Sequence, residues 1–198
     1  GQNEINYYIY KAFEFLNKTV SVSVVSPELQ FDTDYNENDQ QRFINKIIQD
    51  PNNLLYNYSN IGYQQYFVSP DNIHAIKSMF FDAFRLEHVR KNIYEVEPEI
   101  RDSDILCIDI CSVKQSDSPG NICLNPNGFY AEEVCQLASF SGTAYKNRVF
   151  VVSGYHAVKD DKNQTASLIA QMIWYFIHGF YNRIKQSPVQ NQKAYYKF

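Results

Sequence analysis

Short runs of β-branched and aliphatic residues alternate with segments of helical periodicity along this chain, and this alternation constrains the fold more than any other feature. Three runs have the composition of buried strands: 20-VSVSVV-25, 105-ILCIDIC-111 and 148-RVFVVSG-154. Strands that alternate with helices are joined by right-handed crossovers, which make the strands parallel and place helices on both faces of the sheet. The sequence therefore predicts an α/β fold with a mainly parallel sheet.

The other elements follow from periodicity and from helix start and stop signals. Ser69-Pro70 is typical of a helix start, and the residue before a proline avoids helical backbone, so Asp50-Pro51 and Glu97-Pro98 should break the chain. Asn38 is a candidate N-cap and Gly142 a candidate helix end. We expect a strand with its exit loop over 54–68, and helices over 4–18, 39–49, 70–91, 129–142 and 164–183.

Length and charge limit the classes of function. The 198 residues, 44% of them hydrophobic, suffice for one sizeable core, so a single domain over residues 1–198 is expected. The net charge is −4, and the Lys and Arg residues are scattered, which argues against nucleic acid and anionic membranes as partners. The longest apolar run, 167–181, is too short to cross a bilayer, and the N-terminus lacks the pattern of a signal peptide. We therefore expect a cytoplasmic protein.

The four cysteines, at positions 107, 111, 123 and 135, lack the paired spacing of a structural zinc site. An α/β domain of this size does not need disulfides to be stable, so free thiols are expected.

Ligands of a parallel sheet collect outside the carboxyl ends of its strands. The segments that follow the three strands are 26-SPELQFD-32, 109-DICSVKQSDSPG-120 and 154-GYHAVKDD-161. Side chains alternate along a strand, so Cys107, Asp109 and Cys111 should share one face. One interpretation is a metal or acid/base site with thiols nearby. The other, which we favour because no partner motif accompanies it, is a buried aspartate that accepts backbone hydrogen bonds.

The four histidines do not form a short-range ligand pair. His74 and His88 are expected on a helix surface or groove, and His178 in the apolar core. His156 follows a strand but stands alone, so a catalytic role for it is not favoured. The sequence also lacks a glycine-rich phosphate loop and the G-x-S-x-G motif of a nucleophile elbow.

From Gly1 to about Arg183 the chain resembles the ureohydrolase superfamily of arginase, agmatinase and formimidoylglutamase, and most closely a divergent formimidoylglutamase-like bacterial branch. The segments that carry the resemblance are, in order, 57-NYSNIGYQQYFV-68, 105-ILCIDICSVKQSDSPGNICLNPNGFYAEEVCQLASFSG-142 and 164-QTASLIAQMIWYFIHGFYNR-183. The resemblance implies an arginase-like domain of three α/β/α layers, and family members usually form oligomers. They also have an N-terminal segment before the point where this chain begins, so we expect that it is part of a longer chain.

Active members of that superfamily hold a binuclear manganese centre through a G-x-H loop, a D-x-H-x-D motif and a D-x-D motif. A hydroxide that bridges the metals attacks the guanidinium or amidine carbon. The resemblance carries these positions onto Asn3 for the first motif, onto Ser26, Glu28 and Gln30 for the second, and onto Asp109 and Cys111 for the third. The Glu that family members use near the substrate corresponds to Gly154.

Of these six ligand positions, only Asp109 keeps the residue that the family motif has. Two dications about 3.5 Å apart repel each other by roughly 19 kcal/mol at an effective dielectric constant of 20, so the pair needs several hard anionic donors. Cys111 is softer than manganese prefers, and Asn3, Ser26 and Gln30 are neutral. A paired manganese centre is therefore not expected, and Asp109 is interpreted as a remnant of one. No cofactor and no catalytic residue is predicted.

Three hypotheses follow. The leading one is a non-catalytic, arginase-like binding or assembly module that forms a homo-oligomer or binds a protein partner. The second is a hydrolase of guanidino or formimidoyl substrates in which Glu28, Asp109, Cys111 and His156 hold a single ion such as zinc. The third and weakest is a thiol role for Cys107, Cys111 or Cys123, near Lys114. The apolar helix over 167–181 is a candidate oligomer interface.

Overall fold

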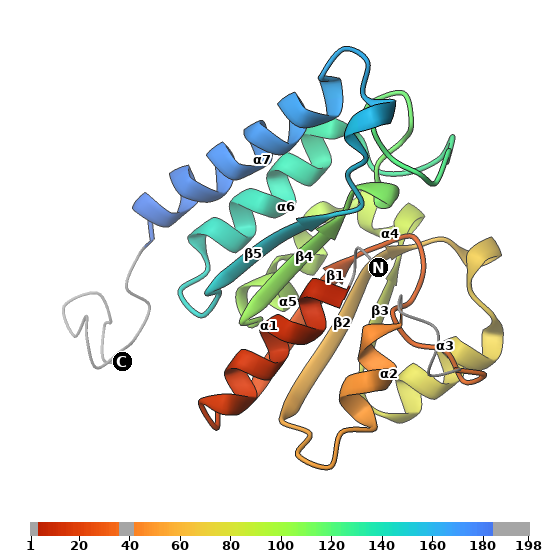
Figure 1. The fold of residues 1–198 in the computed structure, drawn as a ribbon, viewed down its shortest axis with the longest axis vertical. Helices are drawn as coiled ribbons and strands as arrows, with labels where there is room; N and C mark the ends of the chain where they lie inside the picture. Colours follow the sequence, from red (N-terminus) through yellow and green to blue (C-terminus); the bar gives the residue numbers. More distant parts are fainter. Residues whose placement is uncertain (1–3, 36–41, 184–198) are drawn as a thin grey trace, which may run out of the picture.

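The computed structural model describes residues 4–35 and 42–183 of the 198-residue chain. Five parallel strands form one sheet in the order β3-β2-β1-β4-β5 (Figure 1). The strands are β1 (Val20–Val25), β2 (Leu55–Tyr63), β3 (Asp82–Arg85), β4 (Ile105–Asp109) and β5 (Val149–Ser153). β1 and β4 are buried along their whole length, as expected for central strands of a parallel sheet.

Helices cover both faces of this sheet, which confirms the predicted three-layer α/β/α class. One face carries α1 (Glu4–Phe15), α2 (Phe43–Ile48) and α3 (Pro70–Ser78). The other carries α4 (Leu86–Lys91), α5 (Glu97–Arg101), α6 (Ala131–Thr143) and α7 (Gln164–Tyr181), as Figure 1 shows. Each face has its own hydrophobic cluster, and alternate residues of β4 contribute to each, Leu106 and Ile108 to one and Ile105 and Cys107 to the other.

The predicted helix over 70–91 is wrong as a single element. It is two helices, α3 and α4, with strand β3 between them. The chain leaves α3 through Phe80, which has a positive φ of 60°, and Phe81 then packs its ring against Tyr58 at a centroid distance of 5.9 Å. β3 (sequence DAFR) contains no β-branched residue. A short, half-exposed edge strand packs few side chains against the core, so it can form without residues of high strand propensity.

Prolines mark two further boundaries. The predicted break at Glu97-Pro98 is wrong. Pro98 instead occupies the first turn of α5, where its missing N–H group would have no helical partner. The helix expected over 39–49 is seen as α2, which stops before Pro51 and buries the predicted apolar residues Phe43, Ile44 and Ile47. The candidate N-cap Asn38 lies outside the described residues.

Gly142 does not end α6, which continues to Thr143. It lies instead where α6 crosses α7, because a Cβ atom at position 142 would overlap the backbone carbonyl of Phe176. Gly179 is the matching residue on α7, since a Cβ atom there would come within 2.9 Å of the Gly142 backbone. The two glycines therefore allow the helices to approach at backbone distance.

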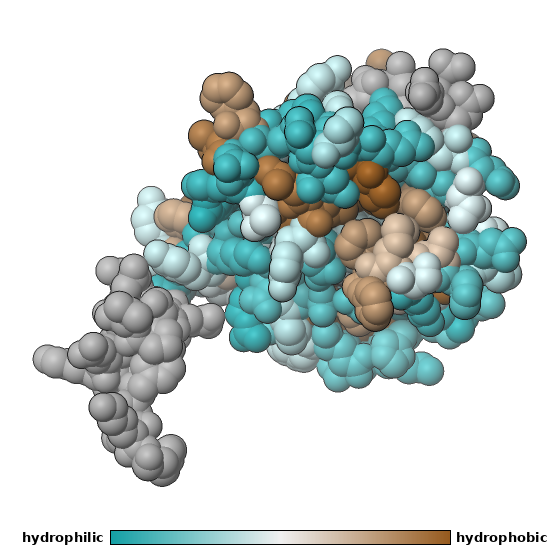
Figure 2. All heavy atoms as spheres, turned by 90° about the horizontal axis from the view of Figure 1, so that it is seen from below, coloured by the Kyte–Doolittle hydropathy of each residue, from teal (hydrophilic) through white to brown (hydrophobic). Residues whose placement is uncertain are grey.

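Figure 2 shows the molecule from below, the side on which the strands begin. This surface is largely hydrophilic, and apolar side chains gather near its middle. Within the described residues, the helices are too short or too polar to cross a membrane. Because parallel sheets bind ligands at the opposite end, a functional site is expected at the carboxyl ends of the strands.

Candidate functional site

The order of the strands places a topological switch point between β1 and β4. From β1 the chain moves outward to β2 and β3, then returns across the sheet to β4 and β5. The segment after β1 leads to a helix on one face and the segment after β4 leads to a helix on the other. Such a point leaves a crevice at the carboxyl ends, where ligands bind in open α/β sheets. Ser26 and Asp109, at the ends of these two strands, lie there as the sequence predicted.

Polar side chains that bond to one another occupy the β1 side of this point. Gln30 Nε2 donates to Ser26 Oγ at 3.2 Å, and both residues are buried. The Tyr58 hydroxyl accepts the Gln30 N–H at 3.1 Å and donates to Asn60 Oδ1 at 3.2 Å. Asn60 Nδ2 in turn donates to the Ser26 carbonyl at 3.3 Å. These hydrogen bonds link Ser26, Gln30, Tyr58 and Asn60 into one ring.

Burial also keeps this network neutral. Tyr58 is fully buried, and this desolvation raises the pKa of its hydroxyl well above the ordinary value, although the hydrogen bond from the Gln30 backbone acts in the opposite direction. The other three side chains are a hydroxyl and two amides, which do not ionise. The cluster thus offers a cation no charge on this side of the switch point.

Glu28 is the single carboxylate among the three positions carried over from the D-x-H-x-D motif, and it forms an ion pair. Its Oε2 lies 2.9 Å from Arg42 Nη2, and Arg42 also donates to the carbonyl of Leu29. The Glu28 side chain is about two-fifths exposed, at 41%. Its charge is therefore matched by a cation of the protein at the surface.

On the β4 side, Asp109 is buried and caps the 3₁₀ turn that follows the strand. Its Oδ1 accepts the backbone N–H of Cys111 at 2.9 Å, which agrees with the structural interpretation of this residue. Gly154, with a positive φ of 82°, packs directly on this carboxylate, and a Cβ atom at position 154 would overlap Asp109 Oδ1. A Glu at position 154 would therefore require Asp109 to move.

The prediction of free thiols is wrong for two of the four cysteines. Cys111 and Cys123 form a disulfide with a Cα–Cα distance of 5.5 Å, whereas Cys107 and Cys135 are free and buried. The chain after Cys111 pairs with the segment that leads into α6, since the Lys114 N–H bonds to the Phe129 carbonyl at 3.0 Å. The spacing of the cysteines in the sequence did not predict this bridge. Because its sulfur is bonded to Cys123, Cys111 does not supply a thiolate to a metal.

Cys107 lies beneath Asp109 on the same face of β4, as the alternation predicted, but Cys111 falls in the turn beyond the strand. Asn6 Nδ2 of α1 donates to Cys107 Sγ at 3.1 Å, and Ser153 Oγ lies 3.7 Å from the sulfur. Burial raises the pKa of the Cys107 thiol to about 12, and the Asp109 charge adds to the effect. Cys107 is therefore protonated near neutral pH and is a poor nucleophile.

The loop after β5 uses its polar groups to hold the start of α7. Buried Asp160 accepts the backbone N–H groups of Thr165 at 3.0 Å and Ala166 at 2.9 Å. Burial opposes ionisation of Asp160, but these hydrogen bonds outweigh it and lower the pKa of the carboxyl group. In the same loop, the His156 N–H bonds to the Gly120 carbonyl at 2.7 Å. The side-chain Nδ1 of His156 is buried and has no hydrogen-bond partner among the described residues.

The remaining histidines lie on helices α3, α4 and α7. His74 is exposed on α3 as expected, and His88 on α4 pairs with Glu95 at 2.6 Å. The prediction of a core position for His178 is wrong, because this residue is exposed and stacks on Trp174 at a centroid distance of 5.1 Å. The charge-free sequence around His178 suggested a buried helix, but only one stripe of α7 is buried.

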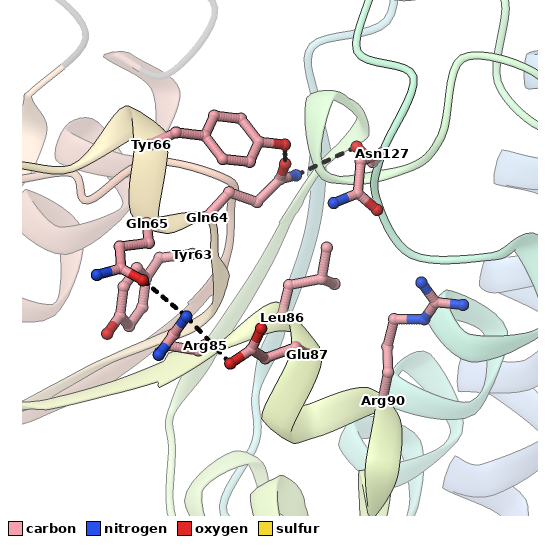
Figure 3. Close-up of a pocket in the computed structure, with 9 residues that line it drawn as sticks. All are labelled: Tyr63, Gln64, Gln65, Tyr66, Arg85, Leu86, Glu87, Arg90 and Asn127. Atoms are coloured by element: carbon pink, nitrogen blue, oxygen red, sulfur yellow. Dashed lines mark hydrogen bonds and ion pairs between the residues drawn. The ribbon is translucent and has the colours of Figure 1, made fainter.

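A cavity that sequence reasoning missed lies at the carboxyl ends of β2 and β3. It has a volume of about 200 Å³. Figure 3 shows Gln64 reaching across to Asn127, whose carbonyl accepts from Gln64 Nε2 at 3.2 Å, while Arg85 bonds to Gln65 at 2.7 Å and to Glu87 at 3.0 Å. The other lining residues are Tyr63, Tyr66, Leu86 and Arg90. Since these residues come from three separate segments, 63–66, 85–90 and the loop at Asn127, no local motif could have indicated the cavity.

The residues at the switch point do not fit a binuclear manganese centre. The first ligand position, Asn3, lies outside the described residues. Within residues 4–35 and 42–183, no three His, Cys, Asp or Glu side chains converge to hold a metal ion. Of the five described ligand positions, Ser26 and Gln30 bond to each other, Glu28 bonds to Arg42, and Cys111 is in a disulfide. Asp109 alone supplies a buried carboxylate.

The sequence matches no protein-family profile and no curated protein. Its fold, in contrast, is similar to that of several solved structures at 16% identity. A formiminoglutamase from Trypanosoma cruzi with Mn²⁺ has a TM-score of 0.81 over 93% of this chain and 64% of its own. A formimidoylglutamase from Bacillus subtilis has a TM-score of 0.79 over 92% and 60%. An arginase from Entamoeba histolytica in complex with L-ornithine has a TM-score of 0.71 over 89% and 67%.

These likenesses confirm the predicted arginase-like fold, which the chain shares despite its low identity. The chain spans less than two thirds of the length of the formiminoglutamase and formimidoylglutamase chains, at 64% and 60%.

The network around Tyr58 makes a prediction about stability. Tyr58→Phe is expected to lower the free energy of unfolding by about 1–3 kcal/mol, because the buried Gln30 N–H loses its acceptor and Asn60 Oδ1 loses its donor. Urea denaturation measures the change. Tyr56→Phe, an exposed position on the same strand, is the matched control and should leave stability unchanged. Equal effects of the two substitutions would contradict the importance of the network.

Proposed function

We propose that this chain is an arginase-like domain that does not assemble a binuclear manganese centre and that acts as a non-catalytic binding or assembly module. One observation supports this most directly. At the switch point, the side chains at the described ligand positions are committed to other side chains or to backbone groups of the protein: Ser26 to Gln30, Glu28 to Arg42, Cys111 to Cys123, and Asp109 to the Cys111 N–H.

The electrostatic argument supports the same proposal. A pair of dications needs several carboxylates to offset its mutual repulsion. Here Glu28 would have to exchange Arg42 for a metal, and Asp109 would have to leave the turn that it caps. The neutral network of Ser26, Gln30, Tyr58 and Asn60 contributes dipoles but no charge. The T. cruzi formiminoglutamase of similar fold is described with Mn²⁺, so it is the natural reference for this comparison.

The alternative of a hydrolase with a rearranged single-ion site gains no support. It requires Glu28, Asp109, Cys111 and His156 together, and the disulfide removes the thiolate from that set. The thiol role gains none either, because Cys107 is buried with a raised pKa and Cys111 and Cys123 are bridged. A binding role could use the cavity of about 200 Å³ at the ends of β2 and β3, which is lined by polar and charged side chains such as Gln64, Arg85 and Glu87.

Metal analysis tests the proposal. Protein purified without chelators and then incubated with excess MnCl₂ is expected to retain much less than one manganese ion per chain after gel filtration. It should not hydrolyse arginine, agmatine or formimidoylglutamate. The B. subtilis formimidoylglutamase, treated in the same way, serves as the positive control for its own substrate. Retention of two manganese ions per chain, or amidine hydrolysis that a chelator stops, would overturn the proposal.

The cytoplasmic location stays a prediction. Disulfides are rare in proteins of the reducing cytosol, so the bridge between Cys111 and Cys123 weighs against a strongly reducing compartment. Thiol labelling of the protein in intact cells, before and after reduction, would decide whether the bridge forms there. The expected single domain within a longer chain also stays a prediction.

A further inference from the structure

The cavity at the carboxyl ends of β2 and β3 is built partly from side chains that other contacts hold in place. Gln64 is buried, and its side-chain amide accepts from the Tyr66 hydroxyl and donates to the Asn127 carbonyl at 3.2 Å. Leu86, also buried, belongs to the hydrophobic cluster on that face of the sheet. Because these contacts do not depend on a ligand, the cavity is preformed, as small-molecule sites usually are.

The charged groups on the β3 side of the cavity are paired with each other. Arg85 Nη2 lies 2.7 Å from Gln65 Oε1 and 3.0 Å from Glu87 Oε1. Glu87 is the one carboxylate among the nine residues that line the cavity. This wall therefore offers a ligand little net charge, and a cationic ligand would have to compete with Arg85 for Glu87.

Arg90, on the opposite wall, is held from behind. Its Cζ atom lies 4.3 Å from the centre of the Tyr130 ring, and its Nε atom lies 3.3 Å from Glu133 Oε1. Figure 3 shows the tip of the guanidinium on the side of the cavity that Asn127 also lines. The Arg90 side chain is only 29% exposed, so its charge lies partly out of water, where hydrogen bonds to a charged group are stronger.

Asn127 adds a second donor next to Arg90. Its backbone carbonyl accepts from Gln64, and its backbone N–H donates to Asn125 Oδ1. Its side-chain amide makes no hydrogen bond to another described residue. Figure 3 shows this amide extending toward Arg90. A guanidinium and a carboxamide that border the same space are suitable donors for a carboxylate.

We propose that this cavity binds a small monocarboxylic acid, with its carboxylate on Arg90 and Asn127 and its short apolar chain over Leu86. The inference deepens the binding role proposed above and rests on it. The guanidinium fork matches the two oxygens of a carboxylate. A dianion such as phosphate needs more positive charge than Arg90 supplies, because Arg85 is already paired with Glu87.

The size of the cavity limits the length of this acid. Its volume of about 200 Å³ equals the liquid volume of roughly six or seven water molecules. A ligand with about that number of non-hydrogen atoms fits, and butyrate is such a molecule.

Titration of the 198-residue chain with sodium butyrate, followed by nuclear magnetic resonance in the presence of EDTA, tests the proposal. The side-chain amide signals of Gln64 and Asn127 should shift along one saturable curve. Arg90→Gln should raise the dissociation constant more than about tenfold, because the hydrogen bonds to a charged group are lost. Circular dichroism establishes that each variant is folded.

Glu133→Gln is the matched control for the Arg90 variant. It removes the carboxylate that pairs with Arg90, whereas glutamine still caps α6 through the Tyr130 N–H. It should bind butyrate at least as tightly as the wild type, because Arg90 then has no competing carboxylate. Arg101→Gln, which removes an arginine paired with Glu97 within α5, should leave the affinity unchanged.

Three outcomes would overturn the proposal. One is the absence of a saturable shift at Gln64 and Asn127 in the wild type. Another is inorganic phosphate or butylamine that shifts the same signals with equal or higher affinity, because the ligand would then not be a monocarboxylate. The last is equal weakening by Arg90→Gln and Glu133→Gln, which would assign the effect to the packing of the wall. Since EDTA excludes manganese from this titration, the butyrate site can fail while the proposed loss of the metal centre stands.

Discussion

Reducing the Cys111–Cys123 disulfide is expected to lower the free energy of unfolding by about 3 kcal/mol, because the bridge closes a loop of twelve residues in sequence and restricts the unfolded chain. For a chain of this length, that loss corresponds to a fall in melting temperature of roughly 6–12 °C. The region that loosens first should be the segment between the two cysteines, where buried Ser118 and Asn121 bond to each other. Thermal unfolding with and without a reductant measures the change.

The double variant Cys111→Ser/Cys123→Ser is the matched control. Its melting temperature should equal that of the reduced wild type and should not respond to the reductant. Cys107 and Cys135 are free, so they should contribute nothing to the difference. A reductant effect that persists in the double variant would show that the stabilisation comes from somewhere else.

Gly142→Val is expected to have an effect at least as large, a loss of roughly 3 kcal/mol or more. The Cβ atom at this position would overlap the Phe176 carbonyl, so α7 would have to move away from α6 and open the packing around Leu168 and Met172. Since the obstacle is backbone rather than a flexible side chain, local rotamer changes cannot relieve it. Denaturant unfolding measures the loss.

A substitution at the next residue separates this crowding from helix propensity. Thr143→Ala lies at an exposed position of the same helix, and it should be neutral or slightly stabilising because alanine is the better helix former. Gly142→Ala should remain destabilising although alanine is preferred over glycine in helices. A stabilised Gly142→Ala variant would contradict the close crossing of α6 and α7.

Sequence reasoning predicted the fold class better than individual elements. The strands β1, β4 and β5 stood out because β-branched and aliphatic residues fill buried parallel strands. β3 was missed, since its four residues (DAFR) carry no such signal and its existence depends on pairing with β2. The helix predicted over 70–91 failed for the same reason, because the positive φ of Phe80 interrupts a sequence whose periodicity alone does not show a break.

The candidate site was predicted in place but not in detail. Parallel strands bring their carboxyl ends to one edge, so Ser26 and Asp109 could be placed at the same end of the sheet from the sequence. That Gly154 packs on Asp109, and that Cys111 is bridged to Cys123, could not be predicted. The cavity lined by Gln64, Arg85 and Asn127 was missed in the same way, because its walls meet only in the folded chain.

The sequence by itself determined the alternation of strands and helices, the shortage of hard anionic donors at the strand ends, and the absence of charge on the last helix. These properties are local, because backbone geometry fixes the periods of strands and helices and the residue types fix the donors. Only the tertiary structure decided which donors satisfy one another and which cysteines are bridged. Those outcomes depend on contacts between segments far apart in the chain, and no local pattern encodes the distance between them.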